Sequence, residues 1–175
     1  MKNLVVVIAF LMASTVSFAQ GAFDKFEDKE GVASVVVNKK MFEMMSKVKV
    51  DAKDKETQQY MNLLKKLDNL KVFTTSNTKI SSDMKATVNS YLKSNPLEEL
   101  MRVNGDGKNV KIYVKSGANE NIVRELLMFI EGSNMKDAGT VVLSLTGNFS
   151  LDEISMLTEK MSLPGGDDLK KASKK

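Results

Sequence analysis

The sequence predicts an α+β fold, in which an antiparallel sheet of about six strands carries amphipathic helices packed on one face. Segments with apolar residues at steps of three and four predict the helices, and short β-branched or alternating segments predict the strands. The clearest single signal is the glycine-rich stretch "NGDGKN" (104–109). It lies between two alternating segments, which is typical of a β-hairpin.

The first 19 residues are predicted to be a signal peptide. Lys2 supplies a positive charge, residues 4–13 form an apolar run, and "SFA" (17–19) places small residues at the −3 and −1 positions of a cleavage site. The apolar core is too short for a bilayer anchor, as in a secretory leader. We therefore expect cleavage after Ala19 and export to the periplasm or the medium. No later apolar run approaches transmembrane length, so no transmembrane segment is expected in the mature chain.

Two strands are predicted in the first half of the mature chain. The run "VASVVV" (32–37), bounded by Gly31 and Asn38, predicts a buried strand. The stretch "LKVFTT" (70–75) predicts a second strand.

Three helices are predicted around these strands. Asn38 can cap a short helix that extends to about Val48, a second helical pattern begins at Asp51, and a third begins at Ser81 or Ser82. The apolar stripes of these helices are Phe42, Met45 and Val48; Tyr60, Met61, Leu64 and Leu67; and Met84, Val88, Tyr91 and Leu92.

From residue 97 the apolar period changes to two. Residues 97–103 and 109–115 alternate on either side of the glycine-rich turn, which predicts a hairpin with one solvent-exposed face, and residues 140–146 alternate as well. The segment "NIVRELLMFIEG" (121–132) suits a helix or a strand, and periodicity alone leaves both open.

The stretch "TGNFSLDEISML" (146–157) predicts a strand, a turn and a capped helix. Ser150 is an N-cap and Glu153 follows three residues later, so the two form a capping box, with Phe149 and Ile154 as the hydrophobic staple. Asp152 and Glu153 are not expected to act as a paired acid and base, because adjacent helical positions point about 100° apart.

One domain is expected over residues 20–163, followed by a disordered basic tail over residues 164–175. The chain contains no cysteine and has a formal net charge of +4. Lysines alternate with acidic residues, and arginine occurs only at positions 102 and 124. A nucleic-acid partner is therefore not expected, because such proteins cluster their basic residues on one face.

The composition excludes several chemistries. Without histidine or cysteine, the chain cannot carry a Ser-His-Asp or Cys-His site, nor the usual zinc, haem or iron–sulfur ligands. No glycine-rich phosphate loop is present. We therefore expect no enzyme activity, and assign no catalytic residues, cofactor or metal.

Three weaker patterns are each better explained by structure. Met41, Met44 and Met45 could hold Cu(I), but a methionine stripe on an amphipathic helix usually packs in a core. Residues 104–109 resemble half of a calcium loop, without the carboxylates that complete one. Paired carboxylates could hydrolyse glycosides, but the chain has no Trp and only three Tyr as stacking surfaces for a sugar. The candidate carboxylates are Glu98, Glu99, Glu125 and Glu131.

Several stretches, read in order after the leader, resemble one exported bacterial family, domain of unknown function 4252. They are "VASVVVNKKMFEMM", "ELMRVNGDGKNVKIYVK", "IVRELLMFIEG" and "VVLSLTGNFSLDEISML". The resemblance implies that 121–131 is a strand, which gives a C-terminal four-stranded meander followed by the capped helix. It also implies a Gram-negative envelope setting, with a link to envelope stress. Many relatives look like lipoproteins, whereas this chain has no cysteine to acylate.

The expected function is a non-catalytic envelope interaction or binding module, with an unidentified envelope protein or ligand as its partner. Its binding surface would be an edge strand or the polar hairpin face that bears Lys111, Tyr113 and Lys115. The alternatives are a small-ligand or Cu(I) carrier that uses Met41, Met44 and Met45, or an envelope-stress accessory protein.

Overall fold

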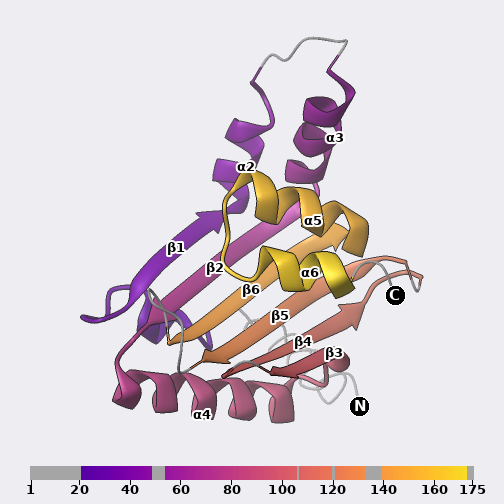
Figure 1. Cartoon of the computed structure of the whole chain (residues 1–175). Helices are drawn as coiled ribbons and strands as arrows, with labels where there is room; N and C mark the ends of the chain where they lie inside the picture. Colours follow the sequence, from indigo (N-terminus) through magenta and orange to yellow (C-terminus); the bar gives the residue numbers. More distant parts are fainter. Residues whose placement is uncertain (1–20, 49–53, 106, 120, 133–138, 173–175) are drawn as a thin grey trace, which may run out of the picture.

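The computed structural model describes residues 21–48, 54–105, 107–119, 121–132 and 139–172, so the predicted leader lies outside the described residues. The described chain forms one six-stranded sheet in which every neighbouring pair is antiparallel (Figure 1). The order is β1-β2-β6-β5-β4-β3. The strands are β1 (Ala33–Asn38), β2 (Leu67–Thr75), β3 (Glu98–Gly105), β4 (Lys108–Ser116), β5 (Val123–Gly132) and β6 (Thr140–Phe149).

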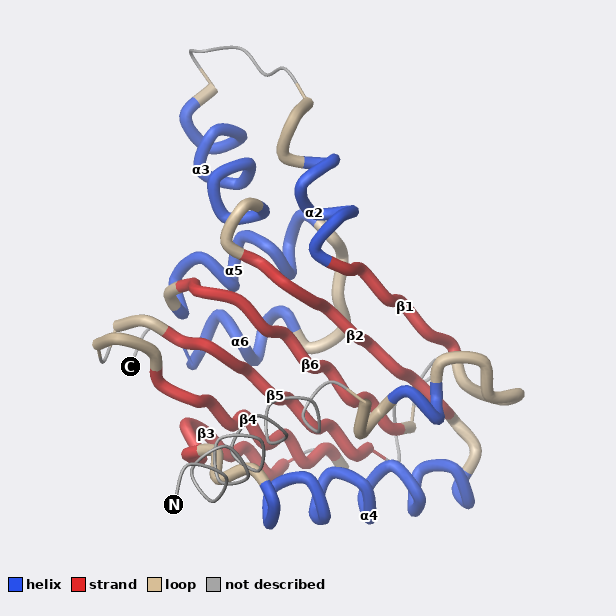
Figure 2. The backbone as a smooth tube through the Cα atoms, turned by 180° about the vertical axis from the view of Figure 1, so that it is seen from behind, coloured by secondary structure: helices blue, strands red, loops and turns tan. Residues whose placement is uncertain are grey.

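Helices lie on both faces of this sheet. The elements α5 and α6 lie in front of the strands in Figure 1 and behind them in Figure 2, where α4 is in front. The helices α2 and α3 stand side by side beyond one end of the sheet (Figure 1). The helical elements are the 3₁₀ turn η1 (Asp24–Phe26), α2 (Lys39–Met45), α3 (Lys55–Leu64), α4 (Thr78–Ser94), α5 (Leu151–Lys160) and α6 (Gly166–Ala172).

The second half of the sheet is the predicted meander. Strands β3 to β6 are neighbours both in sequence and in the sheet, which confirms the hairpin at 104–109 and the strand at 121–131. Residues 126–130 of β5 are all buried, because the strand is covered on both faces. A strand of this kind reads as a continuous apolar run, which explains why periodicity did not separate helix from strand.

The larger core lies on the sheet face covered by α5 and α6, and side chains of α2 and α3 contribute to it at one end of the sheet. Alternate residues of the central strands, such as Leu143 and Leu145, meet Phe42 from α2 and Ile154 from α5 there. Ser150 caps α5 in the predicted capping box, and its side chain accepts a hydrogen bond from the Glu153 backbone N–H.

The smaller core lies on the opposite face, which corrects the expectation that helices cover one face. Helix α4 supplies Met84, Val88 and Tyr91, and the segment before β1 supplies Phe23 and Phe26. They pack against side chains of β2, β5 and β6, namely Phe73, Leu127, Phe129 and Val142. Alternation had identified one apolar side of β6, whereas Val142 on its other side is buried as well.

The C-terminal residues differ from the predicted disordered tail. A turn with Gly165 at φ 81° leads into α6, and Leu169 of this helix is buried in the larger core. Asp168 is also buried and forms an ion pair with Lys108 of β4 at 2.5 Å. The charge of "DDLKKASKK" suggested disorder, but Leu169 and the second of its two aspartates, Asp168, hold the helix against the rest of the protein.

Smaller differences concern where elements begin. Asp54 caps α3, while the predicted start at Asp51 lies outside the described residues. Leu67, expected on the stripe of that helix, opens β2 instead. Asn77 caps α4, so this helix begins before Ser81.

Candidate interaction surface

Exposed apolar side chains gather on one short segment, which comprises β1, α2 and the turn that follows α2. Five of the six large hydrophobic side chains that are exposed in the described residues belong to residues 35–48, and the sixth is Val103 at 36%. We call these five the β1–α2 surface. They are Val35 (46%), Val36 (43%), Met41 (49%), Met44 (57%) and Val48 (60%).

Strand β1 is an edge strand, so the prediction of a buried strand at 32–37 is wrong. Within the described residues β1 pairs only with β2, and of its six residues only Val37 is buried. A β-branched run without charges is the pattern of a covered strand, but no further strand among the described residues pairs with the outer side of β1. The outer side of β1 therefore presents unpaired backbone donors and acceptors together with Val35 and Val36.

The other edge strand, β3, has a different character. It carries Glu98, Glu99 and Arg102, and Arg102 and Glu99 form an ion pair at 2.6 Å. Charges on an edge strand disfavour pairing with another chain. Strand β1, with the sequence "ASVVVN", has none. The two edges of one sheet thus differ in whether they admit a further strand.

Helix α2 extends the apolar surface beyond the end of β1. The Asn38 side chain accepts a hydrogen bond from the Met41 backbone N–H at 3.0 Å, which starts the helix directly at the end of the strand. Phe42 then faces the core and is fully buried. Met41 and Met44 are exposed, so the expectation that they pack in the core is wrong, whereas Met45 packs against the larger core.

Opposite charges flank β1. The segment before it has four acidic residues, Asp24, Glu27, Asp28 and Glu30, against two lysines that both pair with Asp83, and the segment after it begins with Lys39 and Lys40. Glu27 pairs with Lys71 at 2.6 Å, and Lys39 pairs with Asp68 at 2.9 Å. The hydrogen bond to Asp68 raises the pKa of Lys39. Asp28, Glu30 and Lys40 take no part in the ion pairs found between described residues.

The polar hairpin face is a weaker candidate surface. Tyr113 packs against the smaller core, and Lys111 is half-buried, so only Lys115 projects freely. Within β3, Arg102 lowers the pKa of Glu99 by a hydrogen bond. Charges on this face are therefore balanced locally, and it lacks the apolar patch that marks many binding surfaces.

The predicted carboxylate pairs do not form a common site. Glu125 and Glu131 lie on one strand, six residues apart, which separates them by about 20 Å. Glu131 is held by Lys85 at 2.9 Å. Glu153 completes the capping box and pairs with Lys66 at 2.5 Å. No cluster of three acidic residues that could hold a metal ion occurs in the described residues.

The metal candidates also remain without support. The three methionines do not share one orientation, because Met41 and Met44 are exposed while Met45 packs inward. The turn that resembles half a calcium loop joins β3 to β4 with Gly107 at φ 73°, and its Asp106 lies outside the described residues.

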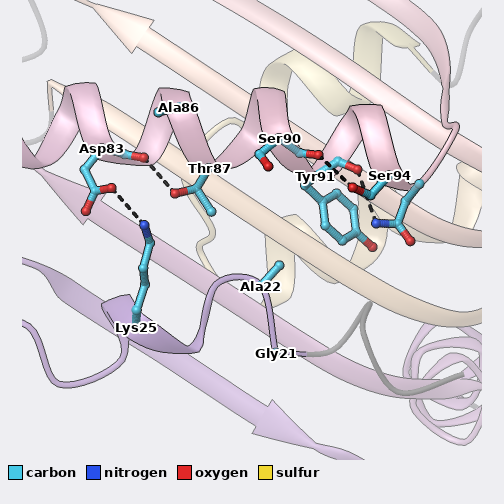
Figure 3. A pocket seen from close by; sticks show the side chains of 10 residues that line it. Gly21, Ala22, Lys25, Asp83, Ala86, Thr87, Ser90, Tyr91 and Ser94 are labelled. Atoms are coloured by element: carbon cyan, nitrogen blue, oxygen red, sulfur yellow. Dashed lines mark hydrogen bonds and ion pairs between the residues drawn. The ribbon is translucent and has the colours of Figure 1, made fainter. Parts of the chain in front are cut away.

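A groove of about 690 Å³ lies between α4 and the segment before β1. Figure 3 shows residues that line it. Lys25 and Asp83 face each other across it at 2.8 Å, and hydrogen bonds from Lys25 and Lys29 lower the pKa of Asp83. The Thr87 hydroxyl donates to the α4 backbone at 2.7 Å, and Ser94 does the same at 3.3 Å. Because these groups already have partners, the groove offers little to orient a ligand.

One buried polar pair lies beside this groove, and the sequence did not reveal it. The hydroxyl of Tyr91 on α4 donates a hydrogen bond to the carboxylate of Glu125 on β5, and both residues are buried. Burial and this hydrogen bond raise the pKa of Tyr91 strongly. Opposite Glu125, the Thr146 hydroxyl is buried without a partner among the described residues. The pair ties α4 to the sheet, since a buried carboxylate needs a donor.

No helix in the described parts of the chain combines the length and the apolar character needed to span a membrane.

Comparisons with known proteins identify the family but no characterised relative. No match was found among curated proteins or among solved structures. The sequence matches one family over residues 26–157, from the end of η1 into α5. The chain therefore belongs to the family described as Domain of unknown function (DUF4252).

Proposed function

We propose that this protein is an exported, non-catalytic interaction module that binds a protein partner through the β1–α2 surface. One observation carries the proposal: the exposed large hydrophobic side chains of the described chain concentrate on an edge strand and the helix that follows it. Exposed apolar residues that lie together mark binding sites on soluble domains. A strand added to an open edge gains main-chain hydrogen bonds as well.

The contrast between the two edges supports this choice of surface. Strand β3 has the charges that prevent a further strand from pairing, and β1 has none. A chain that had only to stay monomeric would gain from a lysine at Val35 or Val36, and it has valine at both.

Two further features support an exported and non-catalytic role. The N-terminal pattern of Lys2, the apolar run 4–13 and Ala19 is typical of a secretory leader. The chain has no histidine or cysteine, and three of its four candidate carboxylates, Glu99, Glu125 and Glu131, serve as ion-pair or buried hydrogen-bonding groups. The family match is compatible with this role and assigns no activity.

Site-specific photocrosslinking in the host tests the proposal. A photoreactive amino acid replaces Val36 or Met44 in the exported protein, and Val103 on β3 serves as the matched edge-strand control. We expect a crosslinked polypeptide at positions 36 and 44, and none at 103. Crosslinks at none of the three positions, or equally at all of them, would contradict the proposal.

A further inference from the structure

We infer that the partner of the β1–α2 surface is a second copy of this chain. Two β1 strands would run antiparallel, and the two six-stranded sheets would join into one continuous sheet. This inference rests on the proposed function and names the partner. Its support is the geometry of β1, the charges on either side of it, and the way in which a symmetric pair covers both open edges.

The geometry restricts how two copies can meet. Val37 faces the larger core, so Val35, two residues before it, lies on that same face and Val36 on the other. Residues opposite each other in an antiparallel pair lie on one face of the sheet. A twofold axis that continues the sheet must therefore lie midway between one residue and its own copy, and at the centre of β1 this residue is Val35 or Val36.

The flanking charges favour the axis at Val35. Glu30 lies five residues before Val35, and Lys40 lies five residues after it. An antiparallel pair centred on Val35 brings the acidic segment before β1 of one copy to the basic segment after β1 of the other, twice. Glu30 and Lys40 are both exposed, and neither takes part in an ion pair between described residues. A parallel arrangement would instead place like charges together.

The twofold symmetry of the pair explains why an uncharged edge strand does not lead to continued addition of further copies. A twofold contact uses the same surface on both copies, so one pairing event covers both β1 edges. The edges that remain at the two ends of the joined sheet are β3, which carries Glu98, Glu99 and Arg102. The assembly therefore stops at two copies.

Sedimentation analysis of the protein released by its host measures directly whether the protein is a dimer. We expect the wild type to be a dimer that dissociates on dilution. Val36→Lys should weaken the dimer at least about tenfold, since it places two ammonium groups beside the joined strands. Val103→Lys, on the other edge, should leave the dimer unchanged, and thermal melting confirms that both variants fold.

A charge exchange tests the antiparallel arrangement without relying on any one variant. Glu30→Lys and Lys40→Glu should each weaken the dimer, because each puts like charges together twice. Mixing the two variants should restore a dimer that contains one of each, since both contacts then join opposite charges.

The results of these experiments distinguish a failure of the self-pairing from a failure of the proposed function. A wild type that stays monomeric up to millimolar concentration, or a dimer indifferent to both Val36→Lys and the charge exchange, overturns the self-pairing. If crosslinks at Val36 then lead to a different polypeptide, the interaction module stands and its partner is another protein. If crosslinks are also missing, both proposals fail.

Discussion

Individual residues join the helices to the sheet, and Tyr91 is the clearest case. Its hydroxyl donates to Glu125, and both groups are shielded from water. We expect Tyr91→Phe to lower the free energy of unfolding by about 1–3 kcal/mol, because it leaves the buried carboxylate without this donor. Urea denaturation measures the change.

Tyr60→Phe is the matched control for this change. Tyr60 is half-buried against the larger core, and burial raises its pKa without help from a hydrogen bond. Removing its hydroxyl should change stability by less than about 0.5 kcal/mol, as is usual away from buried polar partners. Equal losses in both variants would show that the Tyr91–Glu125 bond contributes nothing of its own.

The methionines of α2 allow a residue-level test of the alternative function. We expect anaerobic Cu(I) titration to give the same weak uptake for the wild type and for Met41→Leu/Met44→Leu/Met45→Leu, because Met45 packs inward while the other two are exposed. Stoichiometric, tight uptake that disappears in the triple variant would instead establish a Cu(I) carrier.

At the scale of single elements, the capped helix α5 links stability to pH. Burial favours the neutral acid of Glu153, but hydrogen bonds from Lys66 and from the Ser150 backbone outweigh it and lower the pKa. A carboxyl whose pKa is lowered in the folded state contributes stability above its ordinary pKa and loses that contribution as the pH falls through the folded value.

We therefore expect the free energy of unfolding to fall more steeply for the wild type than for Glu153→Gln between about pH 5 and pH 3. Ser150→Ala should cost about 1 kcal/mol at neutral pH, because the Glu153 backbone N–H loses its cap. Chemical denaturation at a series of pH values measures both effects. Parallel pH profiles for the wild type and Glu153→Gln would contradict the account of this carboxyl.

Helix α6 gives a second test at the scale of elements. Leu169→Ala should destabilise the protein by about 2–5 kcal/mol, because the leucine is buried against the sheet. Lys93→Ala, at an exposed position of α4, should be close to neutral. No loss of stability with Leu169→Ala would mean that the C-terminal residues do not dock.

The elements also show how far the sequence could be read. Local signals identified the hairpin at 104–109 and the capping box at Ser150, because turns and caps depend on neighbouring residues. The position of "VASVVV" at an edge and the docking of Leu169 depend on what lies across the sheet. The neighbouring residues in the sequence do not specify which distant parts of the chain pack against these two segments.

The candidate surface was only partly predictable for the same reason. An edge strand was among the expected binding surfaces, but β1 looked buried because it is β-branched and uncharged. Met41 and Met44 looked like core residues because their spacing fits a helical stripe. The stripe of this short helix is satisfied by Phe42 and Met45, which leaves the other methionines outside. The Tyr91–Glu125 pair joins residues far apart in the chain, so no local pattern could reveal it.

At the scale of the whole molecule, both faces of the sheet are covered, whereas neither edge strand pairs with a further strand among the described residues. Helices cover the larger core on one side, and α4 with the segment before β1 covers the smaller core on the other (Figures 1 and 2). Of the two edges, β3 is charged and β1 is not. This asymmetry is the basis for placing the function at the β1–α2 surface.

The most direct test of whether a partner covers the β1–α2 surface is oxidative footprinting of methionine. It is carried out in the host and on the purified protein at high dilution. Met41 and Met44 are about half exposed, Met156 on α5 is a partly exposed reference, and Met84 is buried. We predict that Met41 and Met44 are protected in the host and oxidised in the dilute protein, while Met156 and Met84 are the same in both. Equal oxidation of Met41 and Met44 under the two conditions would show that nothing covers the β1–α2 surface.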